Sequence, residues 1–176
     1  MATFKDVLKK TLKYEGGYVN DPQDKGQETY CGISRKAWPN FAGWFIVDAH
    51  KPLKTNQIID DEILDKRVEE FYKANFWDKN KLGQIKNIEV AEKIFDLAVN
   101  TGNTKFIQRV LNLLKPALAL KEDGIIGPKT IEAINNFKPQ DALVGGLRYL
   151  QAKWYSNIVD KNPSQAKFLV SWVRRI

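Results

Sequence analysis

The sequence predicts a mainly α-helical fold in one compact domain. Apolar residues recur three and four positions apart near the N-terminus and again over most of the chain after residue 60, which is the spacing of amphipathic helices. Residues 19–57 lack this spacing and are rich in turn formers. The chain has 176 residues, 43% of them hydrophobic and 28% charged, which is typical of a single globular domain with its own core.

A first helix is predicted to begin after Thr3, which suits the N-cap position and has Asp6 three residues later. Its inner face consists of apolar residues at helical spacing, Phe4, Val7, Leu8 and Leu12. The same stripe continues to Glu15, and Gly16-Gly17 then supply the backbone freedom that ends a helix. A carboxyl group therefore stands where a leucine would be expected.

The segment 19–57 is predicted to consist mostly of loops and short turns. Its helix- and strand-breaking sequences are Asn20-Asp21-Pro22, Asp24-Lys25-Gly26, Pro39-Asn40 and Lys51-Pro52. Two short strands are expected within it, at Glu28 to Ile33 and at Trp44 to Val47. Because a long irregular segment in a compact domain is usually functional, this region is the candidate site.

The rest of the chain is predicted to be helical. Apolar stripes and helix-start signals indicate helices in the segments 60–72, 90–99, 106–114, 128–137, 141–159 and 164–173. Asn100-Thr101-Gly102 ends the second of these, and Pro128 suits the first position of the fourth. The sequence contains no internal repeat, low-complexity segment or inter-domain linker.

The charge and the cysteine content limit the classes of function that the protein can have. The formal net charge of +7 favours polyanionic partners, such as nucleic acid, an anionic membrane surface or an acidic cell-wall polymer. The basic residues are scattered and form no nucleic-acid-binding fingerprint. One cysteine, Cys31, and one histidine, His50, form neither an intramolecular disulfide nor a Cys/His zinc site. Cys31 is expected to be a small buried side chain rather than a nucleophile.

Glu15 is the candidate catalytic residue. A partly buried carboxyl group loses solvation when it ionises, so it keeps its proton more readily and can act as a general acid. Glycoside hydrolysis needs such an acid and a second polar group that holds water or stabilises the oxocarbenium-like transition state. The nearby candidates for the second group are Asp21, Asp24, Glu28 and Thr29.

The residues that follow Glu15 suit a polymeric sugar substrate. Gly16 and Gly17 would let a bulky chain approach the acid. Tyr18 could offer a stacking face and Asn20 amide hydrogen bonds to sugar hydroxyls. Each feature also has a purely structural interpretation, because a helix end can fray into solvent and polar turn sequences often serve only as turns.

Several motifs occur in fixed order along the chain. The first runs from Glu15 to Pro22 and continues through Asp24 into Gly26-x-x-Thr29-x-x-Gly32-Ile33-Ser34; the later ones are Phe95 to Gly102 and Asp123 to Thr130. Together they resemble glycoside hydrolase family 108, lysozyme-like peptidoglycan hydrolases of phages and bacteria, some of which have been labelled secretion activators. The resemblance covers most of residues 5 to 137.

The resemblance implies a lysozyme-like helical domain with a loop or short-hairpin active-site region near the N-terminus. Within one compact domain spanning 1–176, residues 1–102 would form the catalytic part and about 103–176 a helical peptidoglycan-binding-like part. The implied activity is that of an N-acetylmuramidase, which cleaves the β-1,4 bond between N-acetylmuramic acid and N-acetylglucosamine. Such a reaction needs no cofactor and no metal.

Carried over residue by residue, the resemblance implies that Glu15 is the general acid, with Asp24 as the second carboxylate and Asp21 in reserve. Thr29 matches the family's threonine and would hold a water molecule. The implied substrate-binding residues are Tyr18, Asn20, Asp21, Asn100 and Gly102. One departure is Gln27, where the family commonly has a second glycine, because its Cβ disfavours a positive φ.

Peptidoglycan glycan strands are the expected partner, and the basic charge would attract the anionic wall. Neither a nucleic-acid partner nor stable membrane insertion is expected. Met1 to Lys5 lead into the first helix without the apolar run of a signal peptide, so synthesis in the cytoplasm and release through a holin, another secretion system or lysis are expected, as for a prophage endolysin. The rival interpretations are a non-catalytic, secretion-associated peptidoglycan-binding module and a basic nucleic-acid binder.

Overall fold

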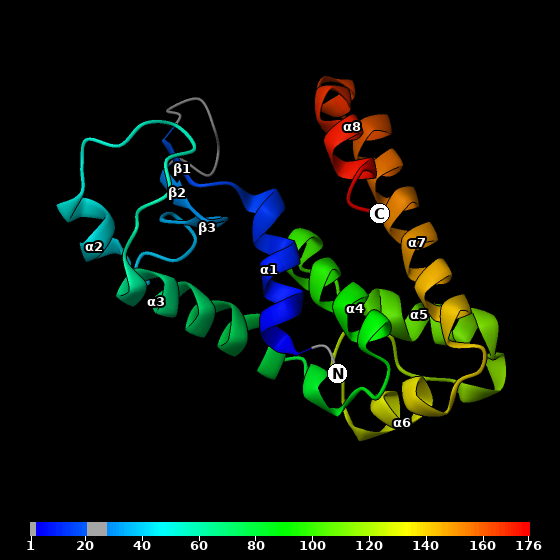
Figure 1. Cartoon of the computed structure of the whole chain (residues 1–176). Coiled ribbons are helices and arrows are strands. Elements are labelled where there is room, and N and C mark those ends of the chain that lie inside the picture. The colour runs from blue at the N-terminus through cyan, green and yellow to red at the C-terminus, as the bar shows by residue number, and fades with distance from the viewer. Residues whose placement is uncertain (1–2, 21–27) are drawn as a thin grey trace. The chain divides into compact units, whose positions relative to one another are not determined.

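The computed structural model describes residues 3–20 and 28–176, without the side chain of Tyr14. The chain divides into two compact units, Met1–Trp77 and Asp78–Ile176. The described residues form mostly helices with one small sheet (Figure 1). The predicted mainly α-helical, lysozyme-like fold class is therefore confirmed.

The first unit combines helices with a three-stranded antiparallel sheet. Its elements in chain order are α1 (Phe4–Glu15), β1 (Tyr18–Asn20), β2 (Glu28–Tyr30), β3 (Ile33–Ser34), α2 (Trp44–Ala49), α3 (Glu62–Tyr72) and the π-helical turn η1 (Lys73–Asp78). Helix α1 begins as predicted, with the Thr3 backbone N–H donating to Asp6 Oδ2 at 2.7 Å. It buries Val7 and Leu8 and ends at Glu15, where Gly16 adopts a φ of 70°.

The sheet has the order β1-β2-β3 and one face in the core. Tyr18, Tyr30 and Ile33 are aligned across the three strands and are all buried. The turn between β2 and β3 consists of Cys31 and Gly32, with φ values of 46° and 77°. Two successive residues at positive φ are what a tight two-residue hairpin requires.

Two strand predictions were wrong. Glu28 to Ile33 is not one strand, because the turn at Cys31-Gly32 divides it into β2 and β3. Trp44 to Val47 lies in the helix α2, with Trp44, Ile46 and Val47 buried. A short apolar run does not distinguish a strand from a buried helical turn. Here the run is helical and packs these three side chains into the core. Strand β1 was not predicted.

Within the described residues, all regular secondary structure of the second unit is helical. Its α-helices are α4 (Ile88–Thr101), α5 (Lys105–Leu114), α6 (Pro128–Asn136), α7 (Gln140–Lys161) and α8 (Ala166–Val173), with short 3₁₀ turns at Leu82–Gln84, Pro116–Leu118 and Pro163–Gln165. The predicted helices are all present, although α8 begins two residues late because the 3₁₀ turn occupies its predicted start.

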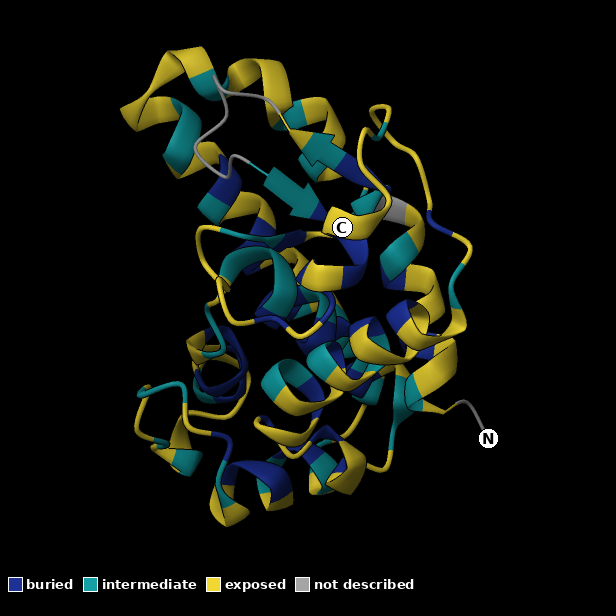
Figure 2. Ribbon diagram, turned by 90° about the vertical axis from the view of Figure 1, so that its left-hand side faces the viewer, coloured by how far each residue is buried: buried dark blue, intermediate teal, exposed yellow. Residues whose placement is uncertain are grey.

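The core of this unit lies where α7 packs against α4 and α5. Figure 2 shows that the helices of the chain carry both buried and exposed residues along their length. Leu143 and Leu147 of α7 are fully buried there. A Cβ atom added to Gly146 would lie 2.6 Å from Val110 Cγ1, so the glycine permits the close approach of α7 to α5.

Candidate active site

Glu15 is half-buried at the last position of α1 and faces the β2–β3 turn. A Cβ atom added to Gly32 in that turn would lie 2.5 Å from Glu15 Oε2 and 2.6 Å from Tyr72 Oη. The Tyr72 hydroxyl donates a hydrogen bond to the Cys31 carbonyl at 2.7 Å. The carboxyl group, the hairpin turn and the end of α3 therefore meet at one place.

The two glycines after Glu15 serve the backbone of the protein itself. Gly16 has a positive φ, and a Cβ atom on Gly17 would lie 2.5 Å from the Gln57 carbonyl oxygen. The Tyr18 N–H donates to that same oxygen at 2.9 Å, and the Asn56 N–H donates to the Tyr18 carbonyl at 2.7 Å. Residues 56–57 thus cover Gly17. The expectation that Gly17 leaves room for a substrate chain is therefore wrong.

Tyr18 lies in the core and not on a binding surface. Only 6% of the residue is exposed, and its hydroxyl donates to Glu28 Oε1 at 3.0 Å. Burial, followed by this contact with Glu28, raises the pKa of the phenol. The expectation that Tyr18 offers a stacking face to a sugar is therefore wrong; the ring instead fixes β1 against Glu28.

Glu28, one of the candidates for the second catalytic group, is held by two cations. Its side chain is 12% exposed and forms ion pairs with Arg35 and, at 2.6 Å, with Lys51. Arg35 and Lys51 also bind Asp48, at 2.7 Å each. This network, which we call the Glu28 cluster (Glu28, Arg35, Asp48 and Lys51), joins β2 to α2 and neutralises Glu28. The Glu28 carboxylate thus forms ion pairs that hold β2 against α2.

The Glu28 cluster predicts a pH-dependent stability. Hydrogen bonds from Lys51 and then Arg35 hold the pKa of Asp48 below the usual value of an aspartate. Ionised Asp48 therefore stabilises the folded chain above about pH 4, and this contribution is lost as the pH falls through the lowered folded-state pKa. Because Asp48 is well exposed, we expect Asp48→Asn to cost no more than about 1 kcal/mol at pH 7. Urea unfolding should show this difference shrinking towards pH 3; a difference that stays constant over this range would contradict the assignment.

The other predicted residues of the first unit lie on or beside the sheet. Thr29 is half-buried in β2, aligned with Val19 and Ser34 on the face opposite Tyr30. Asn20 is exposed at the end of β1. Asp21 and Asp24, together with Gln27, lie outside the described residues.

The predicted residues of the second unit lie at the C-terminal end of α4. The Asn100 amide nitrogen donates to the Asp96 backbone oxygen at 2.8 Å and to Asp96 Oδ1 at 2.6 Å. Both amide hydrogens are thus used, which leaves Asn100 Oδ1 to accept a hydrogen bond. Gly102 caps the helix with a φ of 63°, and no heavy atom of the described chain lies within 4 Å of an added Cβ.

Sequence reasoning missed the polar cluster behind Asn100. Lys93 is 7% exposed and binds Asp96 Oδ2 at 3.2 Å, and Gln151 of α7 is buried beside the same carboxylate. Burial lowers the pKa of Lys93, although Asp96 partly offsets this effect. The available signal was a lysine in the otherwise apolar inner stripe of α4.

Burial raises the pKa of the Cys31 thiol to about 11, so it is a poor nucleophile at neutral pH. Within residues 3–20 and 28–176, no three His, Cys, Asp or Glu side chains gather as a metal site. No helix in these ranges is long and apolar enough to span a bilayer.

The described fold is mostly helical and lysozyme-like, with a half-buried glutamate that ends its first helix beside a short antiparallel hairpin. The family model described as glycosyl hydrolase 108 matches residues 8–102, and a second model, described as a predicted peptidoglycan domain, matches residues 103–176. The first match spans more than half of the chain. The protein belongs to glycoside hydrolase family 108.

Comparison with solved structures supports the fold. The structure of SagA from Brucella abortus matches with a TM-score of 0.67, covering 98% of this chain and 88% of that chain at 22% sequence identity. A search of curated proteins found no match. The family membership makes this chain a glycosidase of peptidoglycan, with a C-terminal part assigned to the same polymer.

Proposed function

We propose that the protein is an N-acetylmuramidase that cleaves the β-1,4 bond between N-acetylmuramic acid and N-acetylglucosamine, with Glu15 as the general acid. The observation that carries the proposal is the half-buried carboxyl group of Glu15 beside the Cys31–Gly32 turn and Tyr72, in a member of a glycoside hydrolase family. A carboxyl group held in place beside a substrate can donate a proton to the leaving oxygen, as general acid catalysis requires.

In the proposed mechanism, Glu15 donates its proton to the glycosidic oxygen as the bond from that oxygen to the anomeric carbon breaks. The leaving sugar departs as an alcohol, and positive charge develops on the anomeric carbon. Water completes the reaction by adding to this carbon and losing a proton to the second carboxylate. Thr29 would hold this water, with Asp24 as the second carboxylate and Asp21 as its alternative. A loop carboxylate and a threonine-held water favour inversion of configuration.

Further substrate-binding residues are proposed in each of the two units. Asn20 is exposed at the end of β1 and can hydrogen-bond sugar hydroxyls. Asn100 would accept a hydrogen bond from a sugar hydroxyl or an acetamido N–H through its available oxygen, and Gly102 leaves the adjacent surface open.

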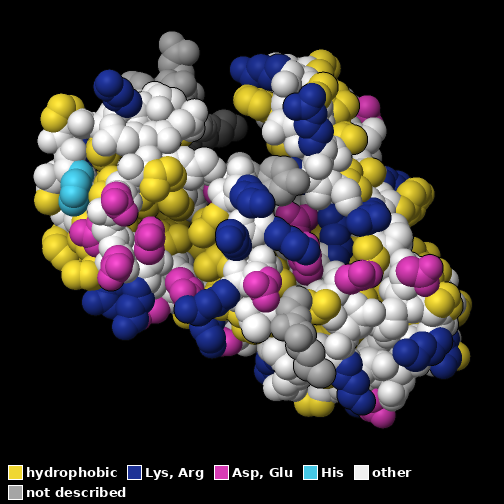
Figure 3. Space-filling view, viewed as in Figure 1, with side chains coloured by type: hydrophobic (Ala, Val, Ile, Leu, Met, Phe, Trp, Pro, Cys, Tyr) yellow, Lys and Arg dark blue, Asp and Glu magenta, His cyan; other side chains and the backbone are white. Residues whose placement is uncertain are grey.

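In this proposal, residues 1–102 catalyse the hydrolysis and residues 103–176 bind the bacterial cell wall. Lys and Arg side chains are spread over the one face of the molecule that Figure 3 shows. With a net charge of +7, they would attract the anionic cell wall in a salt-dependent manner.

The test is the chemical identity of the products from purified peptidoglycan. We expect mass spectrometry after borohydride reduction to find muropeptides that carry reduced N-acetylmuramic acid. Reduced N-acetylglucosamine would identify a glucosaminidase, and anhydro-muramic products a lytic transglycosylase; either result would overturn the muramidase assignment. Sedimentation with peptidoglycan but no products would favour a binding module, for which the match to residues 103–176 is the supporting observation.

A further inference from the structure

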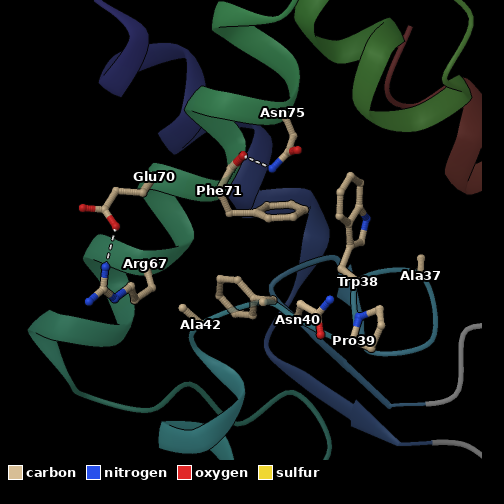
Figure 4. Close-up of a pocket in the computed structure, with 10 residues that line it drawn as sticks. Ala37, Trp38, Pro39, Asn40, Ala42, Arg67, Glu70, Phe71 and Asn75 are labelled. Atoms are coloured by element: carbon tan, nitrogen blue, oxygen red, sulfur yellow. Dashed lines mark hydrogen bonds and ion pairs between the residues drawn. The ribbon is translucent and has the colours of Figure 1, made fainter.

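The first unit contains an aromatic pocket that the proposed reaction does not use (Figure 4). It has a volume of about 430 Å³ and lies between the loop 37–42 and the adjoining ends of α3 and η1. This volume is within the range typical of sites for small ligands. Its main side chains are Trp38 and Asn40 from the loop and Arg67, Glu70, Phe71 and Asn75 from the helical side.

Trp38 is held rigidly and yet remains exposed. Its carbonyl accepts hydrogen bonds from Trp44 Nε1 at 2.8 Å and from the Phe41 N–H at 3.1 Å. Its ring packs edge-on against Phe71, with centroids 4.9 Å apart and an interplanar angle of 87°. Even so, 38% of the residue is exposed. A large ring that is fixed by its neighbours and partly open is suited to stacking on a ligand, because little side-chain entropy is lost on binding.

The polar groups of the pocket favour an uncharged ligand. Among the lining residues, the charged ones are Arg67 and Glu70, which pair with each other at 3.0 Å. Asn75 donates its amide to the Phe71 carbonyl at 2.9 Å, which leaves its oxygen as an acceptor. Asn40 contributes an exposed amide. An apolar face bordered by neutral donors and acceptors complements a sugar ring better than a carboxylate-bearing peptide.

The pocket is also joined to the candidate catalytic residue. Phe71 lines the pocket, and its ring lies 5.4 Å from that of its neighbour Tyr72. Tyr72 in turn contacts the hairpin turn that faces Glu15. The pocket and the acid are therefore connected through one helix end within the first unit.

We propose that this pocket is a second carbohydrate subsite, in which an N-acetylhexosamine ring of the glycan strand stacks on Trp38. The assignment rests on the proposed function, since it takes peptidoglycan glycan as the substrate. Asn40 and Asn75 hydrogen-bond the hydroxyl or acetamido groups of the same sugar. The subsite increases the affinity for long strands and takes no part in proton transfer.

The test measures glycan binding separately from catalysis. The probe is peptidoglycan glycan from which an amidase has removed the peptides, titrated calorimetrically into a Glu15→Gln background so that no hydrolysis occurs. We expect Trp38→Ala to weaken binding about 10-fold, the scale of one lost aromatic contact, and Trp38→Phe to retain most of the affinity. Asn40→Ala, an exposed change that spares the aromatic packing, should weaken it by a smaller factor. In the catalytically competent enzyme, Trp38→Ala should raise KM and leave kcat nearly unchanged.

The matched control is Phe45→Ala, which removes another aromatic residue of the first unit, 70% exposed and outside the pocket. It should bind like the parent. Unchanged affinity in a folded Trp38→Ala variant, or an equal loss in Phe45→Ala, would overturn the subsite. Competition by free stem peptides would assign the pocket to the peptide instead. If the wild type binds glycan through Trp38 but yields no products, the proposed function fails and the subsite stands.

Discussion

Glu15→Gln should lower the rate of peptidoglycan hydrolysis by at least about 10²-fold, because the substitution removes the ionisable proton but keeps the size of the side chain. Turbidity clearing and a zymogram on purified peptidoglycan would measure the loss, with single-time-point product analysis to detect residual cleavage. Glutamine can still donate a weak hydrogen bond to the leaving oxygen, but it cannot transfer a proton to it.

The control is Glu62→Gln, which neutralises an exposed acid at the start of α3 in the same unit. Its clearing rate should match that of the wild type, and all three proteins should melt within a few degrees of one another. Equal clearing by Glu15→Gln and the wild type would show that Glu15 is not the acid.

Gly32→Ala should reduce both activity and stability. Its φ of 77° is unfavourable for alanine, and its Cβ would lie 2.5 Å from Glu15 Oε2 and 2.6 Å from Tyr72 Oη. Either the turn or the carboxyl group must move. Strain at a positive φ, added to this clash, is expected to cost about 1–3 kcal/mol of folding free energy. Displacing the acid by about 1 Å should lower activity by roughly 10²-fold.

Gly124→Ala separates the effect of backbone strain from the effect of displacing Glu15. Gly124 also has a positive φ, of 84°, but the atom nearest to a Cβ added there is Thr104 Oγ1, at 3.1 Å. Denaturant unfolding should show a loss of about 1 kcal/mol for this variant from backbone strain. Its hydrolysis rate at a temperature where it is fully folded should be unchanged. If Gly32→Ala also kept full activity when folded, the turn would not position the acid.

The longer helices could be predicted from the sequence because each one carries its own evidence, whereas the six-residue helix α2 was mistaken for a strand. The stripe of α4 and its left-handed cap at Gly102 are local signals, and both are present in the structure. Strand β1 has no comparable signal. It forms because its backbone pairs with β2 on one side and with residues 56–57 on the other, and a three-residue segment does not reveal such partners.

The candidate site likewise combines features that local sequence reveals with features that depend on distant residues. Glu15 could be identified as a carboxyl group out of place in an apolar stripe, which is a local anomaly. The contact between Tyr72 and Cys31 spans 41 residues, and neither residue's neighbours in sequence indicate it. Glu28 illustrates the opposite error. Its place in the sequence near Glu15 suggested a carboxylate that could act in catalysis, but in the structure it forms ion pairs with Arg35 and Lys51.

The pairing of residues 56–57 with β1 has a consequence for protein engineering. The contact itself is made by main-chain atoms and by the absence of a side chain at Gly17. It also depends on the number of residues that lead into it and on the backbone of Asn56, whose φ of 63° favours asparagine or glycine. A designer who varies this segment therefore has little freedom in loop length or at position 56, and a change at Gln57 also removes its hydrogen bond from the Lys54 N–H at 2.9 Å.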